Sequence, residues 1–120
     1  METYEPQAKL FKALMHPARL AILDVLRTGE ACVCHVEAAL DYRQAYISQQ
    51  LMVLRDAGLV ADRREGWNNY YRVTEPSVFA VLDAAQKVTG QSARPSRRKS
   101  AQACPCPKCS PVVERAAYQV

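Results

Sequence analysis

The sequence lacks a long apolar run, and this bears on where the protein acts. Although 49% of its 120 residues are hydrophobic, no run approaches the roughly 18 consecutive apolar residues that a membrane-spanning helix needs. Residues 1–6 also lack the charged start and apolar stretch of a secretory signal. We therefore expect no membrane partner and a cytoplasmic location, and the length predicts one domain with a single modest core.

The cysteines do not form the even set that a disulfide framework requires. The chain has five, and disulfides are uncommon in reducing compartments, so metal ligation or redox sensing explains them better. Cys32 and Cys34 form a Cys-X-Cys motif rather than the Cys-X-X-Cys of thiol oxidoreductases, and no βαβ pattern is visible. These features disfavour an enzyme.

Positive charge is scarce outside the C-terminal segment. The whole chain has a net charge of +4, and residues 91–120 alone carry six basic residues against one acidic residue, a net charge of +5. Residues 1–90 therefore sum to −1. Any attraction between this part of the chain and a nucleic acid must come from a local face rather than from total charge.

Helical periodicity accounts for most of the first 90 residues. Apolar side chains recur at helical spacing in five segments, which predicts helices over residues 6–15, 17–27, 33–40, 44–57 and 76–90. The third and fourth helices are joined by a short turn, which is the geometry of a helix-turn-helix. In that motif the second helix, here residues 44–57, reads DNA.

Two strand-like segments follow, over residues 59–64 and 70–74. Residues 65–69 supply glycine and asparagine where a hairpin needs a positive φ, so we predict a β-hairpin wing. Trp67, Tyr70 and Tyr71 are interpreted as packing residues of this wing. The predicted fold is mainly α with a small β-hairpin wing, a winged helix-turn-helix over residues 1–90, followed by a basic, cysteine-containing tail over residues 91–120.

The fourth helix has an apolar face and a polar face. At about 100° per residue, Ile47, Leu51 and Leu54 fall together, and the polar side chains fall on the opposite side and the flanks. Glutamine suits bidentate recognition of adenine, and arginines on the turn and wing suit phosphate. The candidate DNA-binding residues are Arg43, Gln44, Ala45, Tyr46, Ser48, Gln49, Arg63 and Arg64. The alternative is a solvated helix face without a partner.

Cys32 and Cys34 lie at the predicted start of the third helix. Thiolates bind soft ions such as As(III), Cd(II), Pb(II) and Zn(II), and a helix N-terminus favours the thiolate form. Residues two apart in a regular helix point about 200° apart, so one ion holds both sulfurs only if this turn is unwound or precedes the helix. The alternative is burial of both cysteines as small apolar residues.

The remaining cysteines lie in the tail, in the run Cys104-Pro-Cys-Pro-Lys-Cys109. Prolines hold such a segment extended, so Cys104, Cys106 and Cys109 are candidate metal donors that complete a site with Cys32 and Cys34. Three thiolates favour As(III) or Pb(II), and four favour Cd(II) or Zn(II). A separate site within the tail, a redox pair and incidental cysteines stay open as alternatives.

Together these motifs resemble the ArsR/SmtB family of metal-responsive winged-helix repressors. The resemblance covers roughly residues 8–90 and rests on the order of the helices, the Cys-Val-Cys motif and the runs His16-Pro-Ala-Arg-Leu-Ala-Ile-Leu23 and Leu54-Arg-Asp-Ala-Gly-Leu-Val60. It implies a homodimer, packed through the first and last helices, that binds double-stranded operator DNA as an inverted repeat and releases it when a metal binds.

Arsenic and cadmium sensors of that family share Cys-Val-Cys, so the resemblance implies a transcriptional repressor induced by As(III) first and by Cd(II) or Pb(II) next. This chain departs from their usual form by His35 in place of aspartate and by Glu37 where some arsenic sensors have a third cysteine. The family's zinc site on the last helix is not supported, because that helix has no histidine, and His16 is interpreted as a capping or packing residue. The alternative function is a thiol redox or persulfide-sensing repressor on the same fold.

Overall fold

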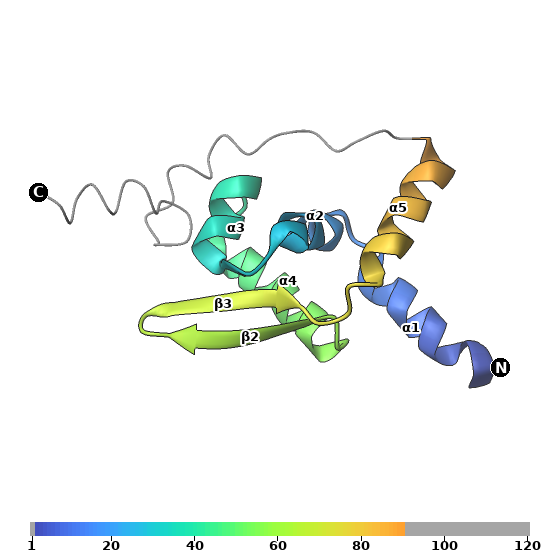
Figure 1. Ribbon diagram of the computed structural model, residues 1–120, viewed down its shortest axis with the longest axis horizontal. Helices are drawn as coiled ribbons and strands as arrows, with labels where there is room; N and C mark the ends of the chain where they lie inside the picture. The colour runs from blue at the N-terminus through green and yellow to red at the C-terminus, as the bar shows by residue number, and fades with distance from the viewer. Residues whose placement is uncertain (1, 91–120) are drawn as a thin grey trace, which may run out of the picture.

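Five α-helices and a three-stranded sheet make up the part of the chain that the computed structural model describes, residues 2–90 (Figure 1). The helices are α1 (Glu5–Leu14), α2 (Pro17–Val25), α3 (Val33–Leu40), α4 (Gln44–Asp56) and α5 (Val78–Thr89), and the strands are β1 (Ala31–Cys32), β2 (Val60–Glu65) and β3 (Asn68–Val73). Short 3₁₀ turns over Glu2–Tyr4 and Leu26–Thr28 precede α1 and follow α2. The predicted helices and wing are confirmed, and the helix ends differ by no more than a few residues.

The core lies between α2, α3 and α4. Ile22 of α2, Val36 of α3 and the predicted apolar face of α4 are fully buried in one cluster. Side chains of this size contribute about 1.5–3 kcal/mol each when they are removed from water. Since Ile47, Leu51 and Leu54 all point into this cluster, the opposite face of α4 is turned outward.

Polar contacts fix the position of α4 against the first two helices. His16 caps α2, because its Nδ1 accepts a hydrogen bond from the backbone N–H of Ala18 at 3.3 Å, which confirms the predicted capping role. Arg19 donates through Nη1 to the carbonyl of Ala13 at the end of α1 and through Nε to the side-chain oxygen of Gln50 on α4, both at 2.9 Å. The guanidinium group therefore ties the end of α1 to α4.

The sheet has the order β1-β3-β2, with both pairs antiparallel. Strand β1 was not predicted, because two residues show no periodicity. Strand β2 lies one residue later than predicted and β3 begins two residues earlier, so the hairpin turn contains only Gly66 and Trp67. Gly66 has a φ of 63°, whereas Asn68 and Asn69 lie in β3 without a positive φ, which corrects the expectation that asparagine would serve the turn.

The aromatic residues of the hairpin have different environments. Tyr71 is buried in the main core, and Tyr70, on the other face of β3, is buried in a small cluster with Cys32. Packing roles for both tyrosines are thus confirmed. Trp67 is fully exposed at the tip, so the interpretation of this residue as a packing residue was wrong.

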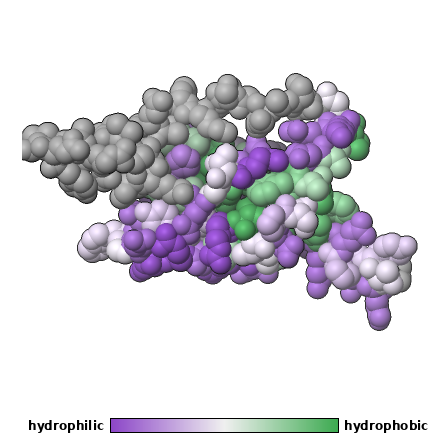
Figure 2. Space-filling model, viewed as in Figure 1, coloured by the Kyte–Doolittle hydropathy of each residue, from purple (hydrophilic) through white to green (hydrophobic). Residues whose placement is uncertain are grey.

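The surface of the described residues is divided by polarity. Figure 2 shows hydrophobic surface in the middle of the molecule and toward the lower part of α5, and hydrophilic surface along the β2–β3 hairpin and at the N-terminal part of α1. Phe11 of α1, Met15 directly after it and Val88 of α5 are large apolar residues that are at least half exposed. Within residues 2–90, no helix has the length and apolar character needed to cross a membrane.

Candidate DNA-binding surface and thiol pair

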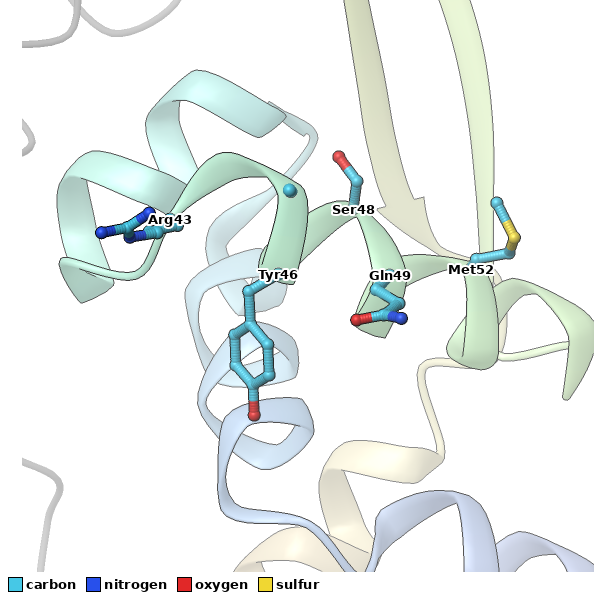
Figure 3. Close-up of a pocket in the computed structure, with 6 residues that line it drawn as sticks. Arg43, Tyr46, Ser48, Gln49 and Met52 are labelled. Carbon is cyan, nitrogen blue, oxygen red and sulfur yellow. The ribbon is translucent and has the colours of Figure 1, made fainter.

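The outward face of α4 forms one side of an open hollow of about 500 Å³. The residues that line it are Arg43, Ala45, Tyr46, Ser48, Gln49 and Met52 (Figure 3). Five of these six are predicted DNA-binding residues, and the sixth, Met52, was missed because an apolar residue gives no sequence signal for DNA binding. The remaining predicted residue of α4, Gln44, is exposed at its first position.

The side chains of the hollow point in different directions. In Figure 3, Ser48 and Met52 point up from α4 and Tyr46 points down, with Gln49 between them. Tyr46 is half-buried: its hydroxyl lies 3.5 Å from Nε2 of His16, and its ring lies edge-on to that of Tyr42 at 5.4 Å. Gln49 and Met52 are exposed, so an amide and an apolar tip are among the groups that this face offers to a base edge.

The two wing arginines point to opposite faces of β2, because side chains alternate along a strand. Asp62, two residues before Arg64, forms an ion pair with Arg55 of α4 at 3.6 Å. Arg64 therefore belongs to the sheet face that covers α4, and it is exposed. Burial, followed by the nearby Asp62 carboxylate, raises the pKa of Tyr71 on this same face.

Arg63 is held by carboxylates on the other face. Its Nε and Nη2 donate to the two oxygens of Glu30 at 2.8 and 2.9 Å, and its Nη1 donates to Glu65 at 2.6 Å. Hydrogen bonds to Glu30 first and then Glu65 raise the pKa of Arg63 further above its ordinary value. The prediction that Arg63 contacts phosphate therefore involves a guanidinium group that already has partners in the free protein.

The thiol pair lies at the junction of β1 and α3. Cys32 is the N-cap of α3, with an extended backbone (φ −85°, ψ 165°), and its sulfur accepts a hydrogen bond from the backbone N–H of His35 at 3.3 Å. Cys34 follows in the first turn of the helix, and the two residues form a disulfide with a Cα–Cα distance of 5.3 Å. Because Cys32 precedes the helix, the two sulfurs converge. A position of one cysteine before the helix is the condition that the sequence analysis set for one ion to bind both sulfurs.

The structure describes only part of the predicted metal site. Cys32 is 1% exposed and Cys34 is half-buried, but Cys104, Cys106 and Cys109 lie outside the described residues. Within residues 2–90, no group of three or more histidine, cysteine or acidic residues is arranged to hold a metal ion. Two sulfurs are thus the donors that this part of the chain brings together.

A recognition helix with a polar outer face, a wing beside it and a core that fixes both define a winged helix-turn-helix DNA-binding protein. Residues 16–62 match the family described as bacterial regulatory protein, arsR family. The chain belongs to this ArsR family of transcriptional regulators. Its relatives and its fold are those of DNA-binding repressors and not of enzymes.

Three comparisons support this assignment. The chain is 47% identical over 77 residues to the biofilm growth-associated repressor of Agrobacterium fabrum, covering 64% of this chain and 66% of that protein. It is 44% identical over 70 residues to the arsenic resistance transcriptional regulator ArsR1 of Pseudomonas putida, covering 58% and 53%. The homodimeric winged helix-turn-helix DNA-binding domain Mb0332 of Mycobacterium bovis, a possible ArsR-family regulator, superposes with a TM-score of 0.66 at 32% identity, covering 78% of this chain and 86% of that domain.

Proposed function

We propose that this protein is a homodimeric repressor that binds an inverted-repeat operator and releases it when a thiophilic ion binds its cysteines. As(III) is the first candidate for this ion, followed by Cd(II), Pb(II) and Zn(II). The observation that supports the proposal is the convergence of the Cys32 and Cys34 sulfurs at the start of α3, the helix that packs against the recognition helix α4. The similarity to an arsenic resistance regulator agrees with this choice of ion.

The donor chemistry suits a soft ion but leaves the site incomplete within residues 2–90. A thiophilic ion supplies a bridge between thiolates, and As(III) takes three of them. Cys32 and Cys34 provide two, so we propose that at least one of Cys104, Cys106 and Cys109 provides the next. Both described sulfurs must be reduced before they can serve as ligands, because a disulfide offers no thiolate.

Ligand binding can reach the DNA-binding surface through α3. The Cys32 sulfur accepts the N–H of His35, and Val36 in the next turn is fully buried against the core that includes Ile47 of α4. An ion that pulls Cys32 and Cys34 toward a third donor must move the first turn of α3. Because a close-packed core transmits such shifts, the pose of α4 changes with it.

The dimer is proposed from the exposed apolar surface of α1 and α5. Phe11, Met15 and Val88 expose 50%, 75% and 85% of their area in the single chain, and exposed apolar surface that gathers in one place marks interaction sites. A twofold dimer through these helices places two copies of α4 on one side of the molecule, as an inverted repeat requires. The similarity to the homodimeric Mycobacterium bovis domain supports a homodimer.

A redox sensor is the second candidate, and the Cys32–Cys34 disulfide favours it. In this alternative the two thiols lose two electrons and two protons as the S–S bond forms. A peroxide accepts them and becomes water, or a polysulfide accepts them and becomes two shorter sulfur species that carry the protons. The site, α3 and the DNA output are the same as in the metal proposal, and only the chemical signal differs.

One titration separates the two candidates. An operator selected from random duplexes is bound to reduced full-length protein, and release is followed by fluorescence anisotropy as arsenite, Cd(II), hydrogen peroxide or polysulfide is added. The metal proposal predicts release by arsenite with loss of three titratable thiols per chain, and X-ray absorption should then count three sulfurs around arsenic. Release by peroxide or polysulfide alone would establish the redox candidate, and release by none would refute both.

The wing offers a separate test of the DNA-binding surface. Replacing Arg64 with alanine should flatten the slope of log affinity against log salt by about one unit, because one phosphate contact is lost. Arg63→Ala should change this slope less, because its guanidinium is already shared by Glu30 and Glu65. Both slopes come from operator titrations at several salt concentrations, and equal slopes for both variants would show that the two arginines contact phosphate alike.

A further inference from the structure

We infer that Arg63 is a positioning residue that couples the thiol pair to the wing, through its ion pair with Glu30. The inference rests on the proposed function in one respect, namely that chemistry at Cys32 and Cys34 controls DNA binding. It assigns a route for that control that runs to the wing and is separate from the route through α3 to α4. We call the contact between Arg63 and Glu30 the wing clamp.

The geometry of the wing clamp is that of a strong, directional contact. Nε and Nη2 of Arg63 donate to Oε2 and Oε1 of Glu30 at 2.8 and 2.9 Å, so both oxygens of one carboxylate meet the planar fork of the guanidinium. The residues are 33 positions apart in the chain, and Glu30 lies two positions before Cys32. The clamp therefore joins the hairpin to the segment that carries the thiol pair.

Tyr70 connects the same elements from within. In the sheet register Tyr70 lies opposite Cys32 on one side and opposite Arg63 on the other. Its ring is buried with Cys32, with Cys34 packed against the pair, and the Arg63 guanidinium carbon lies 4.9 Å from the ring centroid. A shift of Cys32 therefore displaces Tyr70, with which it is packed, and Tyr70 in turn displaces Arg63.

The attachment between β1 and the wing is small enough to be broken. Strand β1 pairs with β3 through only two residues, and the side chains of Arg63 and Glu30 are 47% and 22% exposed. If ligation of the thiols displaces β1, Glu30 moves with it, and Arg63 keeps Glu65 as a partner on its own strand. Arg63 then keeps a carboxylate partner when the hairpin is released, which lowers the cost of opening the clamp.

The test compares two carboxylate variants of the reduced, full-length protein. Glu30→Gln removes the clamp, and Glu65→Gln removes the other carboxylate on Arg63 without touching β1. Each variant loses one negative charge near the wing, so Glu65→Gln controls for the general gain in attraction to DNA. Relative to this control, Glu30→Gln should bind the operator about two- to five-fold more weakly, the size expected for a partly exposed ion pair, and the loss of affinity on adding arsenite should shrink by the same factor.

A second measurement does not depend on the inducer. Iodoacetamide alkylation of the reduced protein is followed on the tryptic peptide of residues 28–43, which contains Cys32 and Cys34 and none of the tail cysteines. Loss of the clamp loosens β1, so Cys32 should react several-fold faster in Glu30→Gln than in Glu65→Gln or the parent protein. Arg63→Lys, which keeps the charge but loses the fork, should resemble Glu30→Gln if circular dichroism shows that the fold is intact.

The two measurements separate the inference from the proposed function. If arsenite and the oxidants leave operator binding of the parent protein unchanged, the proposed function fails, and alkylation alone decides whether the clamp holds β1. Equal alkylation rates in Glu30→Gln and Glu65→Gln would overturn the inference. Equal operator affinity and equal arsenite response in these two variants, with a responsive parent protein, would overturn it as well.

Discussion

At the scale of single residues, Gln49 is the side chain of α4 best placed to read a base. It is exposed in the middle of the hollow, whereas Tyr46 is engaged by His16 and Tyr42. Gln49→Ala should weaken binding to the selected operator by about 1–3 kcal/mol and leave binding to random DNA unchanged, because a bidentate amide contact discriminates between bases. Anisotropy titrations with both duplexes measure this difference, and equal losses on both would remove Gln49 from base recognition.

Trp67 gives a second prediction at this scale. It is the only tryptophan in the chain and is fully exposed at the wing tip, so intrinsic tryptophan fluorescence reports on the wing alone. If the tip enters or lines a groove, operator binding should lower acrylamide quenching of Trp67 by about two-fold or more, since aromatic wedges are shielded there. Random DNA at the same salt concentration is the control. Quenching that is the same in the free and operator-bound protein would place the wing tip in solvent.

At the scale of elements, periodic segments could be predicted and short or long-range features could not. The apolar face of α4 followed from spacing alone, because Ile47, Leu51 and Leu54 obey the helical repeat. Strand β1 has two residues, and the strand character of Asn68 and Asn69 comes from pairing with β2 rather than from their own propensity. Neither leaves a periodic signal.

In the candidate site, too, some features could be predicted from the sequence and others could not. The position of the thiol pair at the start of a helix could be predicted, because Cys-Val-Cys precedes an apolar helical repeat. The contact between Arg63 and Glu30 could not, since it joins residues 33 positions apart through a fold that brings β1 to β3. The exposure of Trp67 was also missed, because a two-residue turn at the tip leaves its ring nothing to pack against.

The N-cap role of Cys32 makes the choice of substitution informative. Serine is a preferred N-cap, so Cys32→Ser can accept the His35 N–H in place of sulfur, whereas Cys32→Ala cannot and should be destabilised by about 1 kcal/mol from the lost cap. Under reducing conditions the alanine variant should therefore unfold at a lower temperature than the serine variant. Both should lose the arsenite response, because neither offers a thiolate. An alanine variant as stable as the serine variant would show that the cap contributes nothing.

At the scale of the whole molecule, two side-chain contacts connect α1, the recognition helix α4, the thiol pair and the wing. Arg19 ties the end of α1 to Gln50 of α4, so a dimer formed through α1 fixes where each recognition helix lies. Glu30 and Arg63 tie the segment of the thiol pair to the wing. The proposed dimer surface, the candidate DNA-binding surface and the thiol pair are thus joined by a few side-chain contacts. In the proposed dimer, a small shift at the cysteines can therefore alter the fit to the operator.

The proposed metal site needs a third thiolate from the tail in addition to the thiol pair. A truncation ending at Ala103 removes Cys104, Cys106 and Cys109, and it should keep the fold and operator binding, because the described core lies within residues 2–90. It should respond weakly or not at all to arsenite, since two thiolates remain where As(III) takes three. Anisotropy of the operator complex during an arsenite titration measures the response.

The matched control for this truncation is the full-length chain with serine at all three tail positions, which keeps the length and charge of the tail. Loss of the arsenite response in both proteins assigns the effect to the thiols, and loss in the truncation alone assigns it to the other tail residues, including Lys108 and Arg115. If the truncated protein binds As(III) and releases DNA as the full chain does, the tail is not part of the sensing site. His35, in the first turn of α3 beside Cys34, then becomes the next candidate for the missing ligand.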